Sequence, residues 1–201
     1  MPSIYGLKPA FQRLLRPITN GLAHVGVTAN QITLAAMMLS FSGGASIIFF
    51  PNDKWPLVLI GPVLFVRMAL NAIDGMLARE HNMKTNLGAF LNELGDVLSD
   101  AALFLPLATR PGIDPFLLVP AVVLGIVSEM AGVVGVQVGS ERRYDGPMGK
   151  SDRAFIFGLL AILLGCGVPP GLWITLLLGI VIALLILTIC NRVRMALRKG
   201  N

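Results

Sequence analysis

The sequence predicts an all-α polytopic membrane protein with six transmembrane helices, preceded by an amphipathic helix that lies in the membrane interface. Of its 201 residues, 55% are hydrophobic and 13% are charged, and the mean hydropathy is +0.76. Soluble domains carry about 25% charged residues, so this composition argues against a soluble fold. Apolar runs of the length that crosses a bilayer, about 20 residues, follow one another along the chain.

The expected interfacial helix spans residues 4–22. Its apolar residues recur three or four positions apart with basic residues between them, a pattern typical of helices that bind anionic membrane surfaces. These basic residues are Lys8, Arg13 and Arg16. Pro9 and Pro17 predict a break or kink in the helix. A solvated amphipathic tail is the alternative that the pattern leaves open.

Six apolar segments follow, and one integral membrane domain is expected over residues 1–201, with the helical bundle at 30–194. The predicted spans are 30–50, 56–78, 87–108, 116–138, 154–168 and 171–189. Tight turns join the spans on one side of the membrane, and longer polar loops join them on the other.

The basic residues predict the orientation of this bundle. Thirteen of the sixteen Lys and Arg residues fall in the N-terminal segment, the second and fourth connecting loops and the C-terminus. Cytoplasmic loops carry such an excess, so both termini should face the cytoplasm, across the inner membrane if the source is bacterial. The net charge of +5 is therefore explained without a nucleic-acid partner, and none is expected.

Polar side chains gather where the second span ends and the third begins. Their spacing places them on one face of each helix, and the short loop between makes the two helices antiparallel neighbours. They are Arg67, Asn71 and Asp74 on the second span, and Asn92, Glu93, Asp96 and Asp100 on the third. Ionisable groups inside a membrane span are costly and usually functional, so this cluster is the predicted site.

The side chains of this cluster favour a hard divalent cation. Carboxylate and amide oxygens suit Mg²⁺ or Mn²⁺. None of the two His and two Cys residues lies in the cluster, which argues against zinc. Basic residues flank the cluster, namely Arg79, Lys84, Lys150 and Arg153. A cation and arginines together suit a phosphate or diphosphate ligand.

The segment from Asn71 to Asp96 reads N-x-x-D-G-x-x-A-R, eight residues, then G-x-x-x-N-x-x-x-D. It resembles the signature of the CDP-alcohol phosphotransferases, D-x-x-D-G-x-x-A-R, eight residues, then G-x-x-x-D-x-x-x-D. The spacing is intact, and the two departures are Asn71 and Asn92. Thr28-Ala29-Asn30 and the expected six spans extend the resemblance more weakly.

This resemblance implies an integral membrane enzyme of phospholipid biosynthesis. Such enzymes transfer a substituted phosphate from a CDP-linked donor, often CDP-diacylglycerol, to the hydroxyl of a small alcohol or lipid acceptor, and they release CMP. It implies that Asp74 and Asp96 ligate metal and that Asp96 is the base acting on the acceptor hydroxyl. The residues implied at the CDP site are Asn71, Asp74, Gly75, Ala78, Arg79 and Gly88.

The two amides leave the metal site open to alternatives. Asn71 and Asn92 still offer carbonyl oxygens as ligands but bring no charge. One possibility is a single-metal enzyme in which Glu93 or Asp100 supplies the lost charge as a further ligand. Another is a relative that binds nucleotide or lipid without catalysis.

The acceptor side is expected near GKSDR, Gly149–Arg153, which resembles the Gly-Lys-x-x-Thr of some phospholipid-making members, with Arg153 in place of Thr. Lys150 and Arg153 are predicted to bind an anionic acceptor, with Arg142, Arg143 and Arg192 as further contributors; contact with anionic lipid headgroups is the alternative. Glu129 is expected to pair with Arg67 or to contact the acceptor.

A small ion-coupled transporter is the competing class, because transporters also use intramembrane carboxylates. Such a protein is expected to carry a repeat and a site at the membrane midplane, whereas these carboxylates cluster at one loop. A homodimer is compatible with the small residues on the spans, but the sequence identifies no interface.

Overall fold

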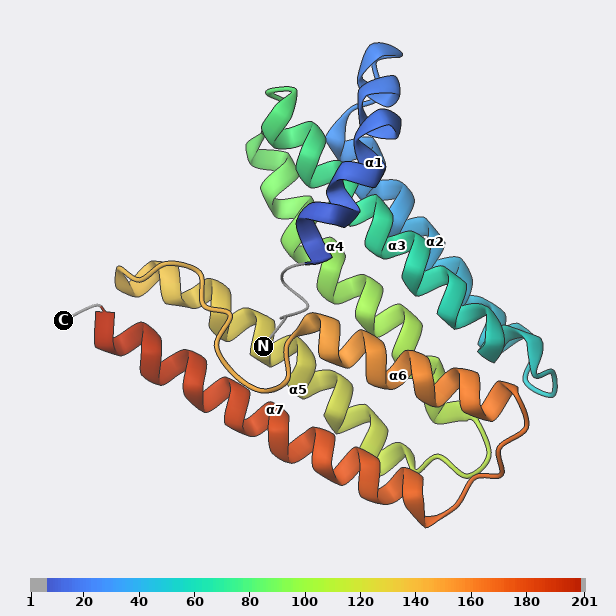
Figure 1. Cartoon of the computed structure of the whole chain (residues 1–201). Helices are drawn as coiled ribbons and strands as arrows, with labels where there is room; N and C mark the ends of the chain where they lie inside the picture. The colour runs from blue at the N-terminus through green and yellow to red at the C-terminus, as the bar shows by residue number, and fades with distance from the viewer. Residues whose placement is uncertain (1–6, 200–201) are drawn as a thin grey trace. The chain divides into compact units, whose positions relative to one another are not determined.

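The computed structural model describes residues 7–199, and across them the chain consists of helices joined by turns and loops (Figure 1). The all-α prediction is confirmed for these residues. The elements are α1 Leu7–His24, α2 Ala29–Phe49, α3 Trp55–Glu80, α4 Asn86–Phe104, η2 Leu105–Thr109, α5 Pro115–Val134, η3 Gly135–Val138, α6 Lys150–Gly165 and α7 Leu172–Lys199.

The N-terminal helix α1 continues through Pro9 and Pro17, so of the expected break or kink the break is wrong. Pro9 lies in the first turn, where its missing N–H has no helical partner to lose. Around Pro17, the buried Leu15 and Thr19 hold the helix against its neighbours. Residues 4–6 of the predicted interfacial helix lie outside the described residues.

Four described helices are long and apolar enough to cross a membrane: Ala29–Phe49, Trp55–Glu80, Pro115–Val138 and Leu172–Arg198. The other two expected spans differ from these in length or charge. Helix α4 carries Glu93, Asp96 and Asp100 within 19 residues, and α6 is 16 residues long.

Large apolar side chains cover the outer faces of these helices. Exposed examples are Phe65, Phe90, Phe116, Phe155 and Ile180. Soluble monomers rarely expose contiguous apolar surface on this scale. The pattern indicates helices that present apolar side chains to lipid.

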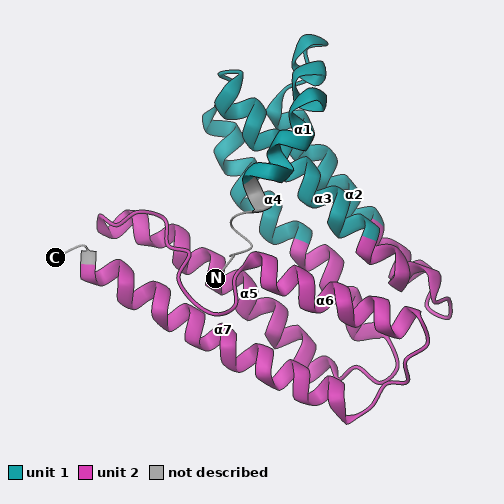
Figure 2. Ribbon diagram, in the orientation of Figure 1, with its two compact units in different colours: residues 1–42, 62–99 teal, residues 43–61, 100–201 magenta. Residues whose placement is uncertain are grey.

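The chain forms two compact units (Figure 2). Unit 1 comprises residues 1–42 and 62–99, and unit 2 comprises residues 43–61 and 100–201. Helices α2, α3 and α4 contribute residues to both.

Unit 1 has a small apolar core between α1, α2 and α3. Its buried members are Leu15, Ala29, Ile32, Ile73, Met76 and Leu77. Thr19 on α1 is fully buried, and its hydroxyl lies 3.9 Å from the sulfur of Met76. This core fixes the ends of α2 and α3 that carry the polar residues of unit 1.

Side chains cap the helices of unit 1 at the ends nearest the polar cluster. At the start of α2, the Thr28 hydroxyl accepts from the Gln31 N–H (3.3 Å), and the Gln31 side chain accepts from the Thr28 N–H (2.9 Å). This reciprocal pair is a capping box. At the start of α4, the Thr85 hydroxyl accepts from the Gly88 N–H at 2.9 Å. The caps therefore define where both helices begin.

Unit 2 contains α5, α6 and α7. Helix α5 packs along α7, and the two run in the same direction because α6 returns the chain between them (Figure 1). Phe104 and Phe157 are buried, with ring centroids 4.7 Å apart, and join the end of α4 to α6.

A buried arginine secures the turn between α2 and α3 in unit 2. The Arg110 guanidinium donates to the carbonyls of Phe50 and Pro51. Burial lowers the pKa of Arg110, and the charge of Asp53 partly offsets that shift. The turn is thus tied to the residues that follow η2.

Close helix contact in unit 2 depends on Gly44, and we predict that Gly44→Ala is destabilising. A Cβ there would lie 1.8 Å from the carbonyl oxygen of Ala102, so backbone would have to move. Overpacking of this kind costs about 1–3 kcal/mol, measurable as a lower thermal midpoint of the detergent-solubilised protein. Gly179→Ala is the control, because a Cβ there meets nothing within 4 Å. Equal midpoints for the two variants would contradict the prediction.

Candidate active site

The first part of the candidate site is Asp74, on the face of α3 that meets α2. Its carboxylate is buried, and the Thr33 hydroxyl lies 2.9 Å from Oδ2. Thr33 was not predicted from the sequence. One signal in the sequence could have indicated Thr33. It lies one turn after Asn30, on the helix that begins at the Thr28-Ala29-Asn30 segment of the resemblance.

The second part joins α3 to α4. The Asn71 amide nitrogen donates to Oδ1 of Asp96 at 3.3 Å. One turn earlier on α3, Arg67 Nη2 donates to the backbone carbonyl of Asp96 at 3.1 Å and lies 3.7 Å from Oδ1. The structure therefore brings Arg67 and Asn71 of α3 to Asp96 of α4, as the helical spacing predicted.

Small residues allow close contacts around this cluster. A Cβ at Gly75 would lie 3.0 Å from a guanidinium nitrogen of Arg79, whose side chain folds back over the glycine. A Cβ at Gly88 would lie 2.6 Å from Oδ1 of Asn30, and the Asn30 amide in turn donates to the Thr85 hydroxyl at 3.3 Å. The start of α2 thus lies directly against the start of α4.

The remaining predicted residues of unit 1 lie on the same two helices. Ala78 is half-buried at the edge of the unit 1 core. Asn92 and Glu93 are half-buried about one turn before Asp96 on α4.

The possible metal donors of this cluster are a mixture of carboxylates and amides. Among the described residues, no group of three or more His, Cys, Asp or Glu side chains is arranged to hold a metal. Two-metal sites use several bridging carboxylates, and here amides replace two of them. Carboxylate oxygens such as those of Asp74 and Asp96 are the type of ligand that a hard cation prefers.

Unit 2 contains a second charged cluster, centred on Glu129 of α5. Its carboxylate lies 3.1 Å from Arg153, 3.3 Å from Arg142 and 3.4 Å from Arg192. Glu129, Arg153 and Arg192 are all buried. Glu129 therefore binds arginines of its own unit, and Arg67 contacts Asp96 in unit 1; the expected pairing of Glu129 with Arg67 stays a prediction.

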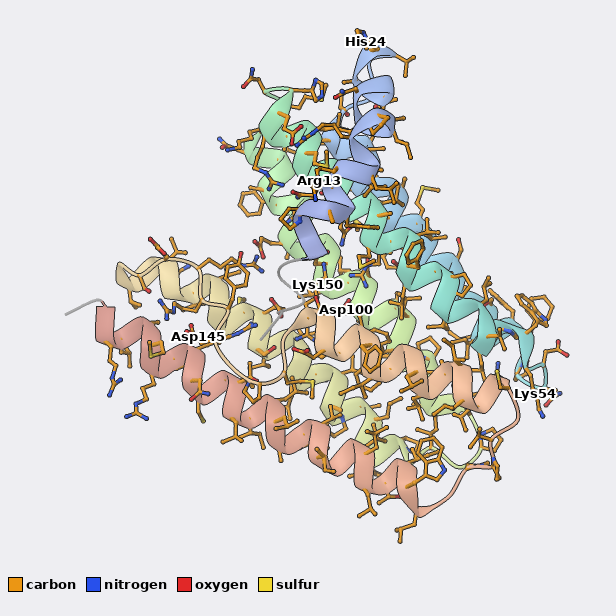
Figure 3. The ribbon with its side chains drawn as sticks, viewed as in Figure 1. Arg13, His24, Lys54, Asp100, Asp145 and Lys150 are labelled. Atoms are coloured by element: carbon orange, nitrogen blue, oxygen red, sulfur yellow. The ribbon has the colours of Figure 1, made fainter. Side chains whose placement is uncertain are left out.

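Arg153 joins two carboxylates within unit 2. It donates to Asp100 at 3.2 Å as well as to Glu129, and its Nη1 lies 3.3 Å from the Ser128 hydroxyl. Figure 3 labels Asp100 on α4 and Lys150 at the first turn of α6. A Cβ at Gly125 would lie 3.0 Å from the Arg153 side chain, so this glycine leaves room for the guanidinium.

The loop before α6 completes the cluster. Arg143 forms two short contacts with Asp145, of 2.8 and 3.0 Å. Arg192 of α7 donates to the carbonyl of Asp145 and to that of Ser128. Arginines therefore connect α5, α7 and this loop.

Comparison with known proteins identifies the family. Residues 26–195 match the CDP-alcohol phosphatidyltransferase family. The chain belongs to this family. It is 44% identical to Inner membrane protein YnbA of Escherichia coli K12 over 195 residues, which cover 97% of this chain and 96% of YnbA. The residues and the matches agree on an integral membrane protein.

Other members of the CDP-alcohol phosphatidyltransferase family match over a shorter length. The chain is 32% identical over 102 residues to an archaetidylinositol phosphate synthase of Pyrococcus horikoshii, covering 51% of the chain and 52% of that relative. It is 33% identical over 97 residues to a phosphatidylinositol phosphate synthase of Mycobacterium tuberculosis, covering 48% and 43%. The chain thus matches about half the length of these synthases.

Solved structures of the phosphatidylinositol phosphate synthase PgsA1 of Mycobacterium tuberculosis share the fold of this chain. The complex with manganese and citrate superposes with a TM-score of 0.75 at 22% identity, covering 90% of this chain and 88% of the other. The form with CDP-DAG bound gives 0.72 at 22% identity, covering 92% and 94%. At this identity the likeness establishes the arrangement of helices.

We predict that Glu129→Gln destabilises the protein by about 3–5 kcal/mol, the usual cost of removing one partner of a buried ion pair. The change leaves three arginines without their shared carboxylate. Thermal unfolding in detergent measures the loss. Glu80→Gln makes the same chemical change at an exposed pair with Arg16 and is expected to leave the midpoint unchanged. A midpoint for Glu129→Gln at the wild-type value would refute the role of Glu129.

Proposed function

We propose that the protein transfers a phosphatidyl group from a CDP-linked lipid, CDP-diacylglycerol, to the hydroxyl of an alcohol, and releases CMP. The observation that carries this proposal is the meeting of Asn71 and Asp96 between α3 and α4. It brings the two halves of the family signature to one place. The CDP-DAG-bound relative of the same fold supports this class of donor.

The donor nucleotide and diphosphate are assigned to the start of α4 and the end of α3. Gly75, Ala78 and Gly88 keep this surface free of large side chains, and Asn71 and Asp74 offer polar atoms to the ligand. Arg79 lies over Gly75 and is exposed, so its guanidinium can turn toward a diphosphate. Charged hydrogen bonds from arginine to phosphate are among the strong ones.

Asp96 is the proposed base. It takes the proton of the acceptor hydroxyl as that oxygen forms its bond to the phosphorus of the phosphatidyl group, and the bond from that phosphorus to the CMP oxygen breaks in line. Arg67 and Asn71 hold the Asp96 carboxylate in one orientation through the contacts described above.

A divalent cation, Mg²⁺ or Mn²⁺, supplies positive charge that offsets the diphosphate oxygens when it is bound. We assign Asp74 and Asp96 as its charged ligands, with the Asn92 oxygen and Glu93 as further donors. Asp100 already binds Arg153, so we assign it to the positioning of that arginine.

We propose that Lys150 and Arg153 bind the acceptor. These two basic side chains would recognise an anionic group on it. Arg153 also holds Asp100 and Glu129, so its guanidinium is fixed before any ligand arrives. Lys150 stands at the start of α6, where a helix N-terminus favours anions.

In the membrane, we propose six spans within one domain, with α4 and α6 crossing in addition to the four apolar helices. Asp96 and Asp100 of α4 both contact arginines. Because charged groups within a membrane need such partners, these contacts support a crossing for α4. Helix α1 exposes Leu14 and Ile18, which supports a position in the interface. The basic loops support a cytoplasmic site, and a homodimer is compatible with this arrangement.

A non-catalytic relative that only binds nucleotide or lipid is the second candidate, and the amides at Asn71 and Asn92 favour it. One experiment separates the two. Purified protein is incubated with Mg²⁺ or Mn²⁺, labelled CDP-diacylglycerol and a panel of alcohols and phosphorylated alcohols, and CMP is measured. Release of CMP with one acceptor supports transfer, and donor binding without CMP supports the second candidate.

We predict that Asp96→Asn lowers turnover by about 10²–10⁴-fold, the contribution of a general base, while binding of CDP-diacylglycerol persists. Initial rates of CMP release and donor binding by the same preparation measure the two effects. Asp53→Asn, at an exposed turn, is the matched control and should keep the wild-type rate. Wild-type turnover in Asp96→Asn would exclude Asp96 as the base.

A further inference from the structure

Arg67 of α3 places a positive charge inside unit 1. Its side chain is 4% exposed, and it contacts both the carbonyl and the carboxylate of Asp96. A guanidinium does not lose its proton in a protein. The site therefore contains one fixed cation before any metal binds.

Asn71 reinforces the same arrangement. Its amide nitrogen faces Oδ1 of Asp96, and the opposite amide orientation would set two acceptor oxygens against each other. Oδ1 of Asp96 therefore accepts a hydrogen bond from the Asn71 amide, and the Arg67 guanidinium lies 3.7 Å from the same oxygen. An Mg²⁺ or Mn²⁺ ligated by this oxygen would stand about 2.1 Å from it, close to a guanidinium of the same sign.

The charge of the site leads to the same conclusion. The signature that the chain resembles has four carboxylates, which match two divalent ions. This chain keeps two of them, Asp74 and Asp96, and adds Arg67. With Glu93, the further donor assigned above, the site has three carboxylates and one guanidinium, and this net negative charge of two matches one divalent ion.

We propose that Arg67 takes the place of one divalent ion, so that each chain binds a single ion on the Asp74 side of the site. This inference rests on the proposed function, since it concerns the metal of that reaction. Arg67 acts as a positioning residue: it holds Asp96 and excludes an ion from Oδ1. Asn71 supports it by donating to the same oxygen.

The first test counts ions. Wild-type protein in detergent is titrated with Mn²⁺, bound metal per chain is determined by equilibrium dialysis with elemental analysis, and electron paramagnetic resonance distinguishes isolated from paired ions. Ions in two-metal sites lie about 3.5–4 Å apart and couple magnetically. We expect one ion per chain with the spectrum of isolated Mn²⁺; two coupled ions would overturn the proposal.

The second test removes the guanidinium. Arg67→Met keeps an unbranched side chain without charge. Mn²⁺ affinity should rise by about tenfold or more, because removing about 1.4 kcal/mol of like-charge repulsion changes a binding constant tenfold. Arg67→Lys keeps the positive charge and is the matched control, with affinity near that of wild type. Unchanged affinity in a folded Arg67→Met would overturn the proposal.

Two further variants separate the effect of Arg67 on the number of bound ions from the effect of the amides Asn71 and Asn92. Asn71→Asp with Asn92→Asp restores the signature carboxylates, and with Arg67 present it should still bind one ion. Adding Arg67→Met to these two changes should allow a second, coupled ion. Two ions while Arg67 is present would show that the guanidinium does not exclude the second ion.

Failure of this inference is distinct from failure of the proposed function. Two coupled ions together with CMP release would reject the role of Arg67 and leave transfer intact. One ion per chain without CMP release for any acceptor would support the role of Arg67 and reject transfer. The ion count in wild-type protein decides the inference even where a variant does not fold.

Discussion

Every charge that lies within the apolar helices needs a partner, because an isolated ionised group buried away from water costs several kcal/mol. This constraint determines both charged clusters of the molecule. In unit 1, Arg67 on α3 meets Asp96 on α4. In unit 2, Glu129 on α5 meets arginines from α6, α7 and the loop before α6. Each cluster therefore joins successive helices of its unit.

Small residues let these contacts form. The missing Cβ of Gly44 leaves space for the Ala102 carbonyl, and that of Gly88 leaves space for the Asn30 side chain. In a membrane, helix association relies on such close packing and on polar contacts, because lipid removes most of the hydrophobic drive between helices. The glycines therefore set how closely the helices approach, and the charged pairs set which faces meet.

The sequence could predict features that depend on local pattern. Apolar runs indicate where helices lie, so α2 and α3 begin and end within about two residues of the predicted spans, the usual uncertainty of helix boundaries. The helical spacing of Asn71 and Asp96 also predicted their faces. It could not predict that Glu129 binds three arginines, because long flexible side chains reach partners whose position depends on tertiary packing. The continuity of α1 at Pro17 depends likewise on the buried Leu15 and Thr19.

Asn71 and Arg67 are best understood as two parts of one arrangement. An aspartate at position 71 would set a second carboxylate against Oδ1 of Asp96, and that pair would require a cation between its oxygens. An asparagine donates an N–H to the same oxygen, so no ion is needed there. The guanidinium one turn away then supplies the charge that keeps Asp96 compensated. The amide that departs from the family signature and the arginine outside it thus depend on each other, and a change at either position alters what the other must do.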